Sequence, residues 1–146
     1  SLYRTLIKAK QNNDKPLQTW IKSELNGYAN DEEVPDYRKV TSFSFEYSGF
    51  NLMTQVNKAP LPVGFIGDEL IKDISQIKYK AGIREIESFS NSGKTVYIDR
   101  SFLAGEVSRN SGEAIKCVSI SQLIPASFFS AIVAAVKERL IEVLMP

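Results

Sequence analysis

The sequence predicts an α+β fold in one compact domain, and three observations lead to this prediction. Apolar residues recur at helical spacing near both ends of the chain, and they alternate with polar residues in two central regions. No strand–helix–strand repeat indicates a doubly wound sheet. We expect an N-terminal α-hairpin, two β-hairpin-like strand pairs and two longer amphipathic helices. A chain of 146 residues suits one such domain with a hydrophobic core, so residues 1–146 are expected to form a single domain.

The N-terminal α-hairpin is predicted from helical spacing on both sides of a proline. Residues 1–11 carry apolar side chains at helical spacing, and "NNDKP" then interrupts the pattern. Pro16 suits the first turn of a second helix, because its missing N–H would lack a helical partner there. That helix is expected to end at Asn26, where Gly27 can adopt positive φ.

Two strands are predicted next. Aromatic residues alternate with polar ones at Phe43, Phe45 and Tyr47, which is typical of a strand with one buried face. We expect a turn at Ser48–Gly49 and a second strand beyond it. Residues 58–67, "KAPLPVGFIG", contain two prolines and two glycines and are predicted to form a loop.

The second half of the chain predicts a helix over residues 68–89, two strands and a closing helix. The strands are residues 94–100 and 114–121, joined by a polar connection. The closing helix is expected to begin near Pro125. Its apolar stripe is expected to face the core, with dimerisation or docking of a following region as the alternative, and contains Phe129, Ile132, Val133, Val136, Leu140 and Val143.

Composition excludes several classes of site. The absence of histidine excludes imidazole-dependent triads and the two-histidine zinc helix, and a single cysteine, Cys117, excludes an intrachain disulfide. Cys117 is expected to be a small buried strand residue. We expect no cofactor and no metal site. A net charge of +1, without a basic block, makes nucleic acid an unlikely high-affinity partner.

The termini lead to an expectation about location and extent. No secretory apolar segment is visible, and no run approaches the roughly 18 apolar residues of a membrane span, so we expect a cytoplasmic protein without a membrane partner. The chain begins at Ser1 and ends just after a helical run. We therefore expect it to be the N-terminal part of a longer protein.

Two short motifs resemble catalytic signatures incompletely. "NSGKT" has Ser88 where a phosphate loop needs its first glycine, and it leads from a helix into a strand, the reverse of the required order. Pro35–Asp36 resembles half of a restriction-type nuclease site. However, the position that should be a lysine is Arg38, and no acidic residue in the chain precedes a lysine by two positions.

The stretch "LQTWIKSELNGYANDEEVPDYRKV", residues 17–40, resembles the signature of the AbiTii-type domain of bacterial abortive-infection phage-resistance proteins. Weaker similarity continues in "APLPVGFIGDEL", "IREIESF" and the closing helix, so the resemblance extends over most of the chain. It implies a role in antiphage defence beside other effector or sensor modules, but no catalytic mechanism. The structural signature residues are Trp20, Glu24, Leu25, Asn26, Gly27 and Pro35.

Four further residues form the candidate binding surface: Tyr28, Asp36, Tyr37 and Arg38. Aromatic and arginine side chains at a strand entry suit docking of an anion or peptide. The alternative is a structural role, in which Arg38 bridges the loop acids Asp31, Glu32 or Glu33, or caps the carbonyls that end the second helix. No catalytic residue is predicted.

Three functions remain open from the sequence. The leading hypothesis is a non-catalytic sensor, coupling or protein-interaction module that binds a protein partner or its own C-terminal effector domain, with a possible homodimer through the last helix. The alternative is a nucleotide- or small-anion-sensing domain that uses Arg38 together with Arg84 or Arg109. The second alternative is a nuclease-type effector, which requires converging carboxylates.

Overall fold

The computed structural model describes residues 2–144, and the chain divides into two compact units. Unit 1 comprises residues 1–39, 78–94 and 126–146, and unit 2 comprises residues 40–77 and 95–125. Helices and antiparallel strands occur in the same chain, which confirms the predicted α+β class. The expectation of one domain over residues 1–146 stays a prediction, and residues 1, 145 and 146 lie outside the described residues.

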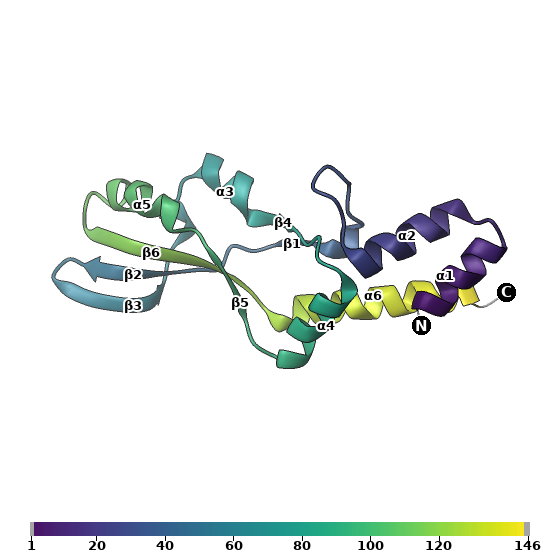
Figure 1. Cartoon of the computed structure of the whole chain (residues 1–146). Coiled ribbons are helices and arrows are strands. Elements are labelled where there is room, and N and C mark those ends of the chain that lie inside the picture. Colours follow the sequence, from purple (N-terminus) through teal and green to yellow (C-terminus); the bar gives the residue numbers. More distant parts are fainter. Residues whose placement is uncertain (1, 145–146) are drawn as a thin grey trace. The chain divides into compact units, whose positions relative to one another are not determined.

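Unit 1 is helical and contains the predicted α-hairpin, α1 (Leu2–Gln11) followed by α2 (Lys15–Asn26) (Figure 1). The Asp14 side chain accepts a hydrogen bond from the Leu17 N–H at 3.2 Å and so caps α2, with Pro16 in its first turn. The unit also contains α4 (Ile83–Ser92) and α6 (Ala126–Leu144). All four helices contribute buried apolar side chains: Leu2, Ala9, Trp20, Ile21, Ile83, Ile86, Phe129, Ile132 and Val136. Tyr28 and Val34, in the loop after α2, are also buried.

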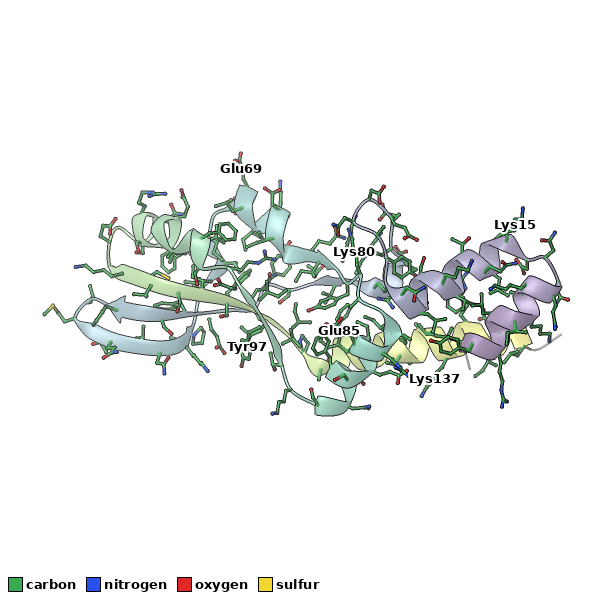
Figure 2. All side chains as sticks on the ribbon, in the orientation of Figure 1. Lys15, Glu69, Lys80, Glu85, Tyr97 and Lys137 are labelled. Atoms are coloured by element: carbon green, nitrogen blue, oxygen red, sulfur yellow. The ribbon has the colours of Figure 1, made fainter. Side chains whose placement is uncertain are left out.

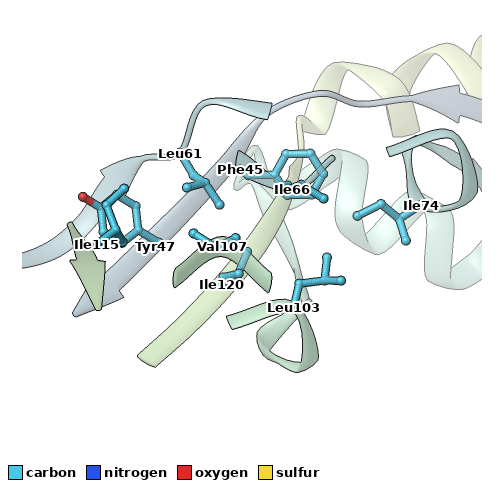
Figure 3. Packing of buried hydrophobic residues seen from close by; sticks show 9 residues of the cluster. All are labelled: Phe45, Tyr47, Leu61, Ile66, Ile74, Leu103, Val107, Ile115 and Ile120. Carbon is cyan, nitrogen blue, oxygen red and sulfur yellow. The ribbon is translucent and has the colours of Figure 1, made fainter. Parts of the chain in front are cut away.

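Unit 2 is built on an antiparallel sheet with the strand order β3-β2-β6-β5. The strands are β2 (Phe45–Asn51), β3 (Thr54–Pro60), β5 (Val96–Asp99) and β6 (Ile115–Ile124). One face packs against the short helices α3 (Asp68–Ser75) and α5 (Ala104–Asn110), as Figures 1 and 3 show. This core contains Phe45, Tyr47, Leu61, Ile66, Ile74, Leu103, Val107, Ile115 and Ile120.

The remaining elements are short. Strand β1 (Lys39–Thr41) pairs with β4 (Gln76–Lys78) in a two-stranded sheet. Three 3₁₀ turns complete the described chain: η1 (Asp36–Arg38), η2 (Val63–Phe65) and η3 (Ser101–Leu103). None of the helices within residues 2–144 has the length and apolar character needed to span a membrane.

The single helix predicted over residues 68–89 is wrong. Helix α3 ends at Ser75, residues 76–78 form β4, and a new helix begins at Ile83. In the interruption, the carbonyl groups of Tyr79 and Ala81 accept hydrogen bonds from Arg38, and the Lys80 carbonyl accepts one from the Tyr28 N–H. Because these carbonyl groups accept hydrogen bonds from residues distant in the sequence, they do not continue a helical hydrogen-bond pattern.

Two other local predictions are wrong. The predicted turn at Ser48–Gly49 lies inside β2, at a register irregularity, and the hairpin turn is at Leu52–Met53. The polar connection that begins at Ala104 contains α5, whose Val107 side chain is fully buried in the core of unit 2. The predicted pairing of the last two strands is confirmed, since β5 pairs antiparallel with β6.

The closing helix begins at Ala126, as the position of Pro125 predicts. In the stripe predicted on this helix, Phe129, Ile132 and Val136 are buried, whereas Val133, Leu140 and Val143 are half-buried. The aromatic rings of Tyr79, Phe89 and Phe128 surround that of Phe129 at centroid distances of 4.9 Å, 4.9 Å and 5.3 Å. Helix α6 is therefore anchored in unit 1 through its first half.

Candidate functional site

Helix α2 places Trp20 and Glu24 on one face, and Tyr28 follows Glu24 by another four residues. Residues four apart are neighbours on a helix surface. Because α2 ends at Asn26, Tyr28 reaches the same side only through the turn at Gly27, which has a φ of +92°. A Cβ atom at Gly27 would lie 2.8 Å from the Lys80 carbonyl oxygen, so the position also requires the absence of a side chain.

Glu24 and Arg38 form an ion pair whose two side chains are 0% exposed. The guanidinium donates to both carboxylate oxygens, from Nε to Oε2 at 3.1 Å and from Nη2 to Oε1 at 2.7 Å. Arg38 reaches this position from η1, which follows Pro35 directly. The bidentate geometry gives the pair a defined orientation as well as charge neutralisation.

Two tyrosine hydroxyl groups and an indole complete the hydrogen bonding of the carboxylate. Glu24 Oε2 accepts from the Tyr28 hydroxyl at 2.5 Å and from the Tyr37 hydroxyl at 2.7 Å. The Trp20 indole N–H donates to the Tyr37 oxygen at 2.8 Å. We call Trp20, Glu24, Tyr28, Tyr37 and Arg38 the Glu24 network. It connects α2 to the chain on both sides of the loop that follows it.

Arg38 also holds the segment before α4. Its Nη1 donates to the carbonyl oxygens of Tyr79, at 3.1 Å, and Ala81, at 2.5 Å. Its own backbone carbonyl accepts from the Tyr79 N–H at 2.8 Å. At the neighbouring Gly82, an added Cβ would lie 2.7 Å from the Leu25 carbonyl oxygen, so the backbones of α2 and this segment approach closely.

The acidic loop between α2 and η1 makes contacts of its own. The Glu32 carboxylate accepts from the Ser23 hydroxyl at 2.8 Å and from the Ala29 N–H at 3.1 Å. Glu33 forms ion pairs with Lys39 and Lys78, which lower the pKa of its exposed carboxyl group. The partner of Arg38 is thus Glu24 of α2, and not the loop acids suggested by the sequence.

The structure places the residues of the candidate binding surface at different depths. Arg38 and Tyr28 are buried, Tyr37 is half-buried, and Asp36 is exposed, with an ion pair to Lys39 at 3.3 Å. The signature residues Leu25, Gly27 and Pro35 are half-buried, Trp20 and Glu24 are buried, and Asn26 is exposed. Docking at this surface stays a prediction.

Sequence reasoning missed two contributors to the site. The segment 79–81 supplies only backbone groups, which no sequence motif records. The guanidinium of Arg139 lies 4.3 Å from the centroid of the Trp20 ring and so adds a cation–π contact from α6. The recurrence of Trp20, Glu24 and Tyr28 at spacing four was an available signal that these side chains share one face.

The network leaves no buried polar side-chain atom unpaired within residues 2–144. In the same residues, no three carboxylate or thiol side chains cluster in a way that could hold a metal ion. Cys117 is half-buried on β6, where burial raises the pKa of its thiol. Of the alternative sensing arginines, Arg84 lies on α4, and Arg109 pairs with Glu106 on α5.

The buried tyrosines predict a loss of stability at alkaline pH. Burial, reinforced by Glu24, raises the pKa of Tyr28 far above its ordinary value; burial also raises those of Tyr37 and Tyr79. Unfolded tyrosine titrates near pH ~10, so above that pH the unfolded chain releases protons that the folded chain retains. The free energy of unfolding should therefore be steady up to about pH 9 and fall above about pH 10.

Urea unfolding at a series of pH values from about pH 9 to above pH 10 measures this decline in the free energy of unfolding. Tyr28→Phe should make the decline shallower. The matched variant Tyr3→Phe, which changes an exposed side chain of α1, should leave the slope as in the wild type. An equal slope in the wild type and Tyr28→Phe would contradict the assignment.

Comparison with known protein families identifies the chain. The family described as AbiTii matches residues 2–145, which is nearly the whole chain. The chain belongs to the AbiTii family. Membership associates this AbiTii chain with abortive-infection defence against phage. No curated protein and no solved structure shows significant similarity to the AbiTii chain.

Proposed function

We propose that the chain is a non-catalytic coupling module in abortive-infection defence, which docks a protein partner through α1 and the end of α6. The supporting observation is a group of exposed large apolar side chains on these two helices. Tyr3 and Ile7 of α1 are 64% and 57% exposed, and Ile141 and Leu144 of α6 are 56% and 47% exposed. We call these four residues the α1–α6 surface.

The two parts of this surface belong to neighbouring helices. Val143 of α6 lines a small cavity together with Thr5 and Ala9 of α1, and Figure 1 shows α1 beside the end of α6. Tyr3 and Ile7 are four residues apart, and Ile141 and Leu144 are three apart, so each pair shares a helix face. Exposed apolar side chains grouped on adjoining helices are typical of an interaction site.

The charged residues of α1 indicate which class of partner would bind the α1–α6 surface. Helix α1 carries Arg4, Lys8 and Lys10 and no acidic residue. A partner segment with apolar and acidic side chains would match this combination, because opposite charges at the rim of an interface speed association and exclude wrong partners. We therefore propose that the α1–α6 surface binds an acidic amphipathic segment of a partner protein. A second copy of this chain and an anionic membrane are alternatives that the test separates.

The Glu24 network supports a structural role for the family signature. Both carboxylate oxygens of Glu24 and all three guanidinium nitrogens of Arg38 make internal hydrogen bonds, and both side chains are 0% exposed. A general base or nucleophile needs an atom that can reach a substrate. The network instead positions α2 against the segment before α4, and the proposed docking takes place on other helices.

Plaque formation on bacteria that express the complete natural protein tests the proposal. Ile7→Ser combined with Ile141→Ser should abolish protection while thermal unfolding stays close to that of the wild type. Partner affinity should fall about 10–100-fold, because each truncated apolar anchor contributes roughly 1 kcal/mol or more. The matched control is Leu52→Ser combined with Met53→Ser, two exposed residues at the hairpin turn of unit 2.

The outcomes separate the possible occupants. Full protection by the Ile7/Ile141 variant would refute the proposed surface. A change from dimer to monomer in that variant would assign the surface to a second copy, and loss of sedimentation with anionic vesicles would assign it to a membrane. Asp36→Lys tests the surface predicted from the sequence, and loss of protection in that variant alone would place docking at Asp36 and Tyr37.

A further inference from the structure

The sheet face of unit 2 that is opposite the core contains a hollow of about 250 Å³. Its floor comes from the two central strands: Glu46 and Ser48 of β2, and Ser119 and Ser121 of β6. Glu46 lies opposite Ser121 in the register, and Ser48 lies opposite Ser119. The core residues Phe45, Tyr47 and Ile120 alternate with these positions and point to the other face.

Two register irregularities meet at Ser48 and bend the sheet there. On β3, both Asn57 and Lys58 fall between the partners of Tyr47 and Gly49, and on β6 the extra residue is Val118. Gly49 allows the second irregularity, because a Cβ atom would lie 2.1 Å from the Lys116 carbonyl oxygen. Bulges that re-aim side chains are frequent beside functional sites.

Lys58 has a φ of +52°, a conformation that costs a lysine backbone energy. The Ser48 hydroxyl holds it there, by accepting the Lys58 N–H at 3.1 Å and donating to the Asn57 side chain at 3.2 Å. The Lys58 ammonium lies 6.0 Å from the centroid of the Tyr97 ring. Lys58 and Tyr97 come from the two edge strands, so they meet across the floor of the hollow.

The polar groups around the hollow have capacity for a ligand. Within residues 2–144, the Glu46 carboxylate and the hydroxyl groups of Ser119 and Ser121 make no hydrogen bond to another group of the chain. The Lys58 ammonium has no carboxylate partner there, and Tyr97 is 52% exposed. Figure 2 shows Tyr97 on the side of the sheet away from α5.

We propose that this hollow binds a mononucleotide, with the base against Tyr97, the ribose hydroxyls on Glu46 and the phosphate on Lys58. Each group selects one part of that ligand. A tyrosine ring offers a stacking surface to any base. A carboxylate accepts hydrogen bonds only, and two vicinal hydroxyls can both donate to it. The ammonium lies at the outer limit of cation–π attraction to Tyr97, so it can turn to a phosphate at small cost.

The same groups disfavour simpler or larger ligands. Inorganic phosphate would leave Tyr97 unused and would lie near the negative Glu46, and a neutral sugar would leave Lys58 unpaired. The volume is just below the roughly 300–1,000 Å³ of sites for drug-sized ligands, which suits one nucleotide and not several. The site is distinct from the α1–α6 surface in every residue, so either proposal can fail without the other.

Isothermal titration calorimetry of the complete natural protein with AMP, CMP, GMP and UMP tests this inference. At least one should bind with saturation, and its dissociation constant should rise with salt, because screening weakens the contact between Lys58 and phosphate. Tyr97→Ala and Lys58→Met should each weaken binding about tenfold or more, equivalent to ~1.4 kcal/mol. Lys58→Met should leave the affinity for the matching nucleoside unchanged. These side chains are exposed, so the variants should remain folded.

Lys116→Met is the matched control, because Lys116 is an exposed lysine on β6 that does not line the hollow. It should bind as the wild type does. The inference is refuted by the absence of saturable binding at millimolar mononucleotide, by equal affinity in the Tyr97 and Lys58 variants, or by inorganic phosphate binding as tightly as the nucleotide. Tight binding of an oligonucleotide without mononucleotide binding would also refute it.

Discussion

Arg38→Met should lower the free energy of unfolding by about 3–5 kcal/mol, the usual cost of removing one partner of a buried ion pair. The variant leaves the Glu24 carboxyl group 0% exposed and without its cationic partner, with hydrogen bonds only from the Tyr28 and Tyr37 hydroxyls. It also removes the donors to the carbonyl groups of Tyr79 and Ala81. Urea unfolding followed by circular dichroism measures the loss, which is a large part of the total stability of a typical domain.

A double-mutant cycle separates the ion pair from the rest of the network. Glu24→Met combined with Arg38→Met removes both charges, so it should be less destabilising than the sum of the two single variants by about 1.5–3 kcal/mol. Arg38→Lys should recover only part of the loss, because a lysine cannot reproduce the bidentate contact and both carbonyl contacts together. If the effects of the two single variants simply add, Glu24 and Arg38 do not stabilise the fold as a pair.

Phe129→Ala should lower the free energy of unfolding by a similar amount, about 3–5 kcal/mol. Phe129 is completely buried, and its ring contacts the rings of Tyr79, Phe89 and Phe128. Truncation to alanine removes these contacts and leaves a cavity at the point where α6 meets the segment before α4 and α4 itself. Thermal and urea unfolding of the purified variant measure the effect.

Ile141→Ala on the same helix is the control for Phe129→Ala. Its side chain is exposed, so truncation should change the stability by less than about 0.5 kcal/mol. A small effect at Phe129 would show that α6 is not anchored through its first half. A large effect at Ile141 would show that the end of α6 is covered in solution, which would also be relevant to the proposed docking surface.

The sequence predicts well those parts of the fold that depend on local chemistry. Helices begin or end, as expected, beside Pro16, Gly27 and Pro125. Strands β5 and β6 overlap the two regions predicted to form strands, and they pair with each other as expected. In the candidate site, the signature stretch supplies Trp20, Tyr28, Tyr37 and Arg38, which the structure brings together in one network, whereas their role in binding stays a prediction.

The parts that sequence reasoning missed depend on contacts between distant segments. Residues 76–82 continue an apolar helical pattern, but their carbonyl groups bind Arg38 and the Tyr28 N–H, and this interrupts the helix. Partners for Arg38 were sought in the nearby loop, whereas Glu24 lies 14 residues away in the chain. The hollow on unit 2 was also missed, because bulges at Ser48 depend on the pairing register and leave no motif.

The position of Trp20 has a practical consequence for studies of folding. It is the one tryptophan in the chain, and it belongs to unit 1, where Tyr37 and Arg139 contact its ring. Emission excited selectively at tryptophan therefore follows the melting of unit 1, and the sheet of unit 2 is spectroscopically silent in that channel. Far-ultraviolet dichroism follows the backbone of both units. Recording both signals on one sample thus shows whether unit 1 and unit 2 unfold together or one after the other.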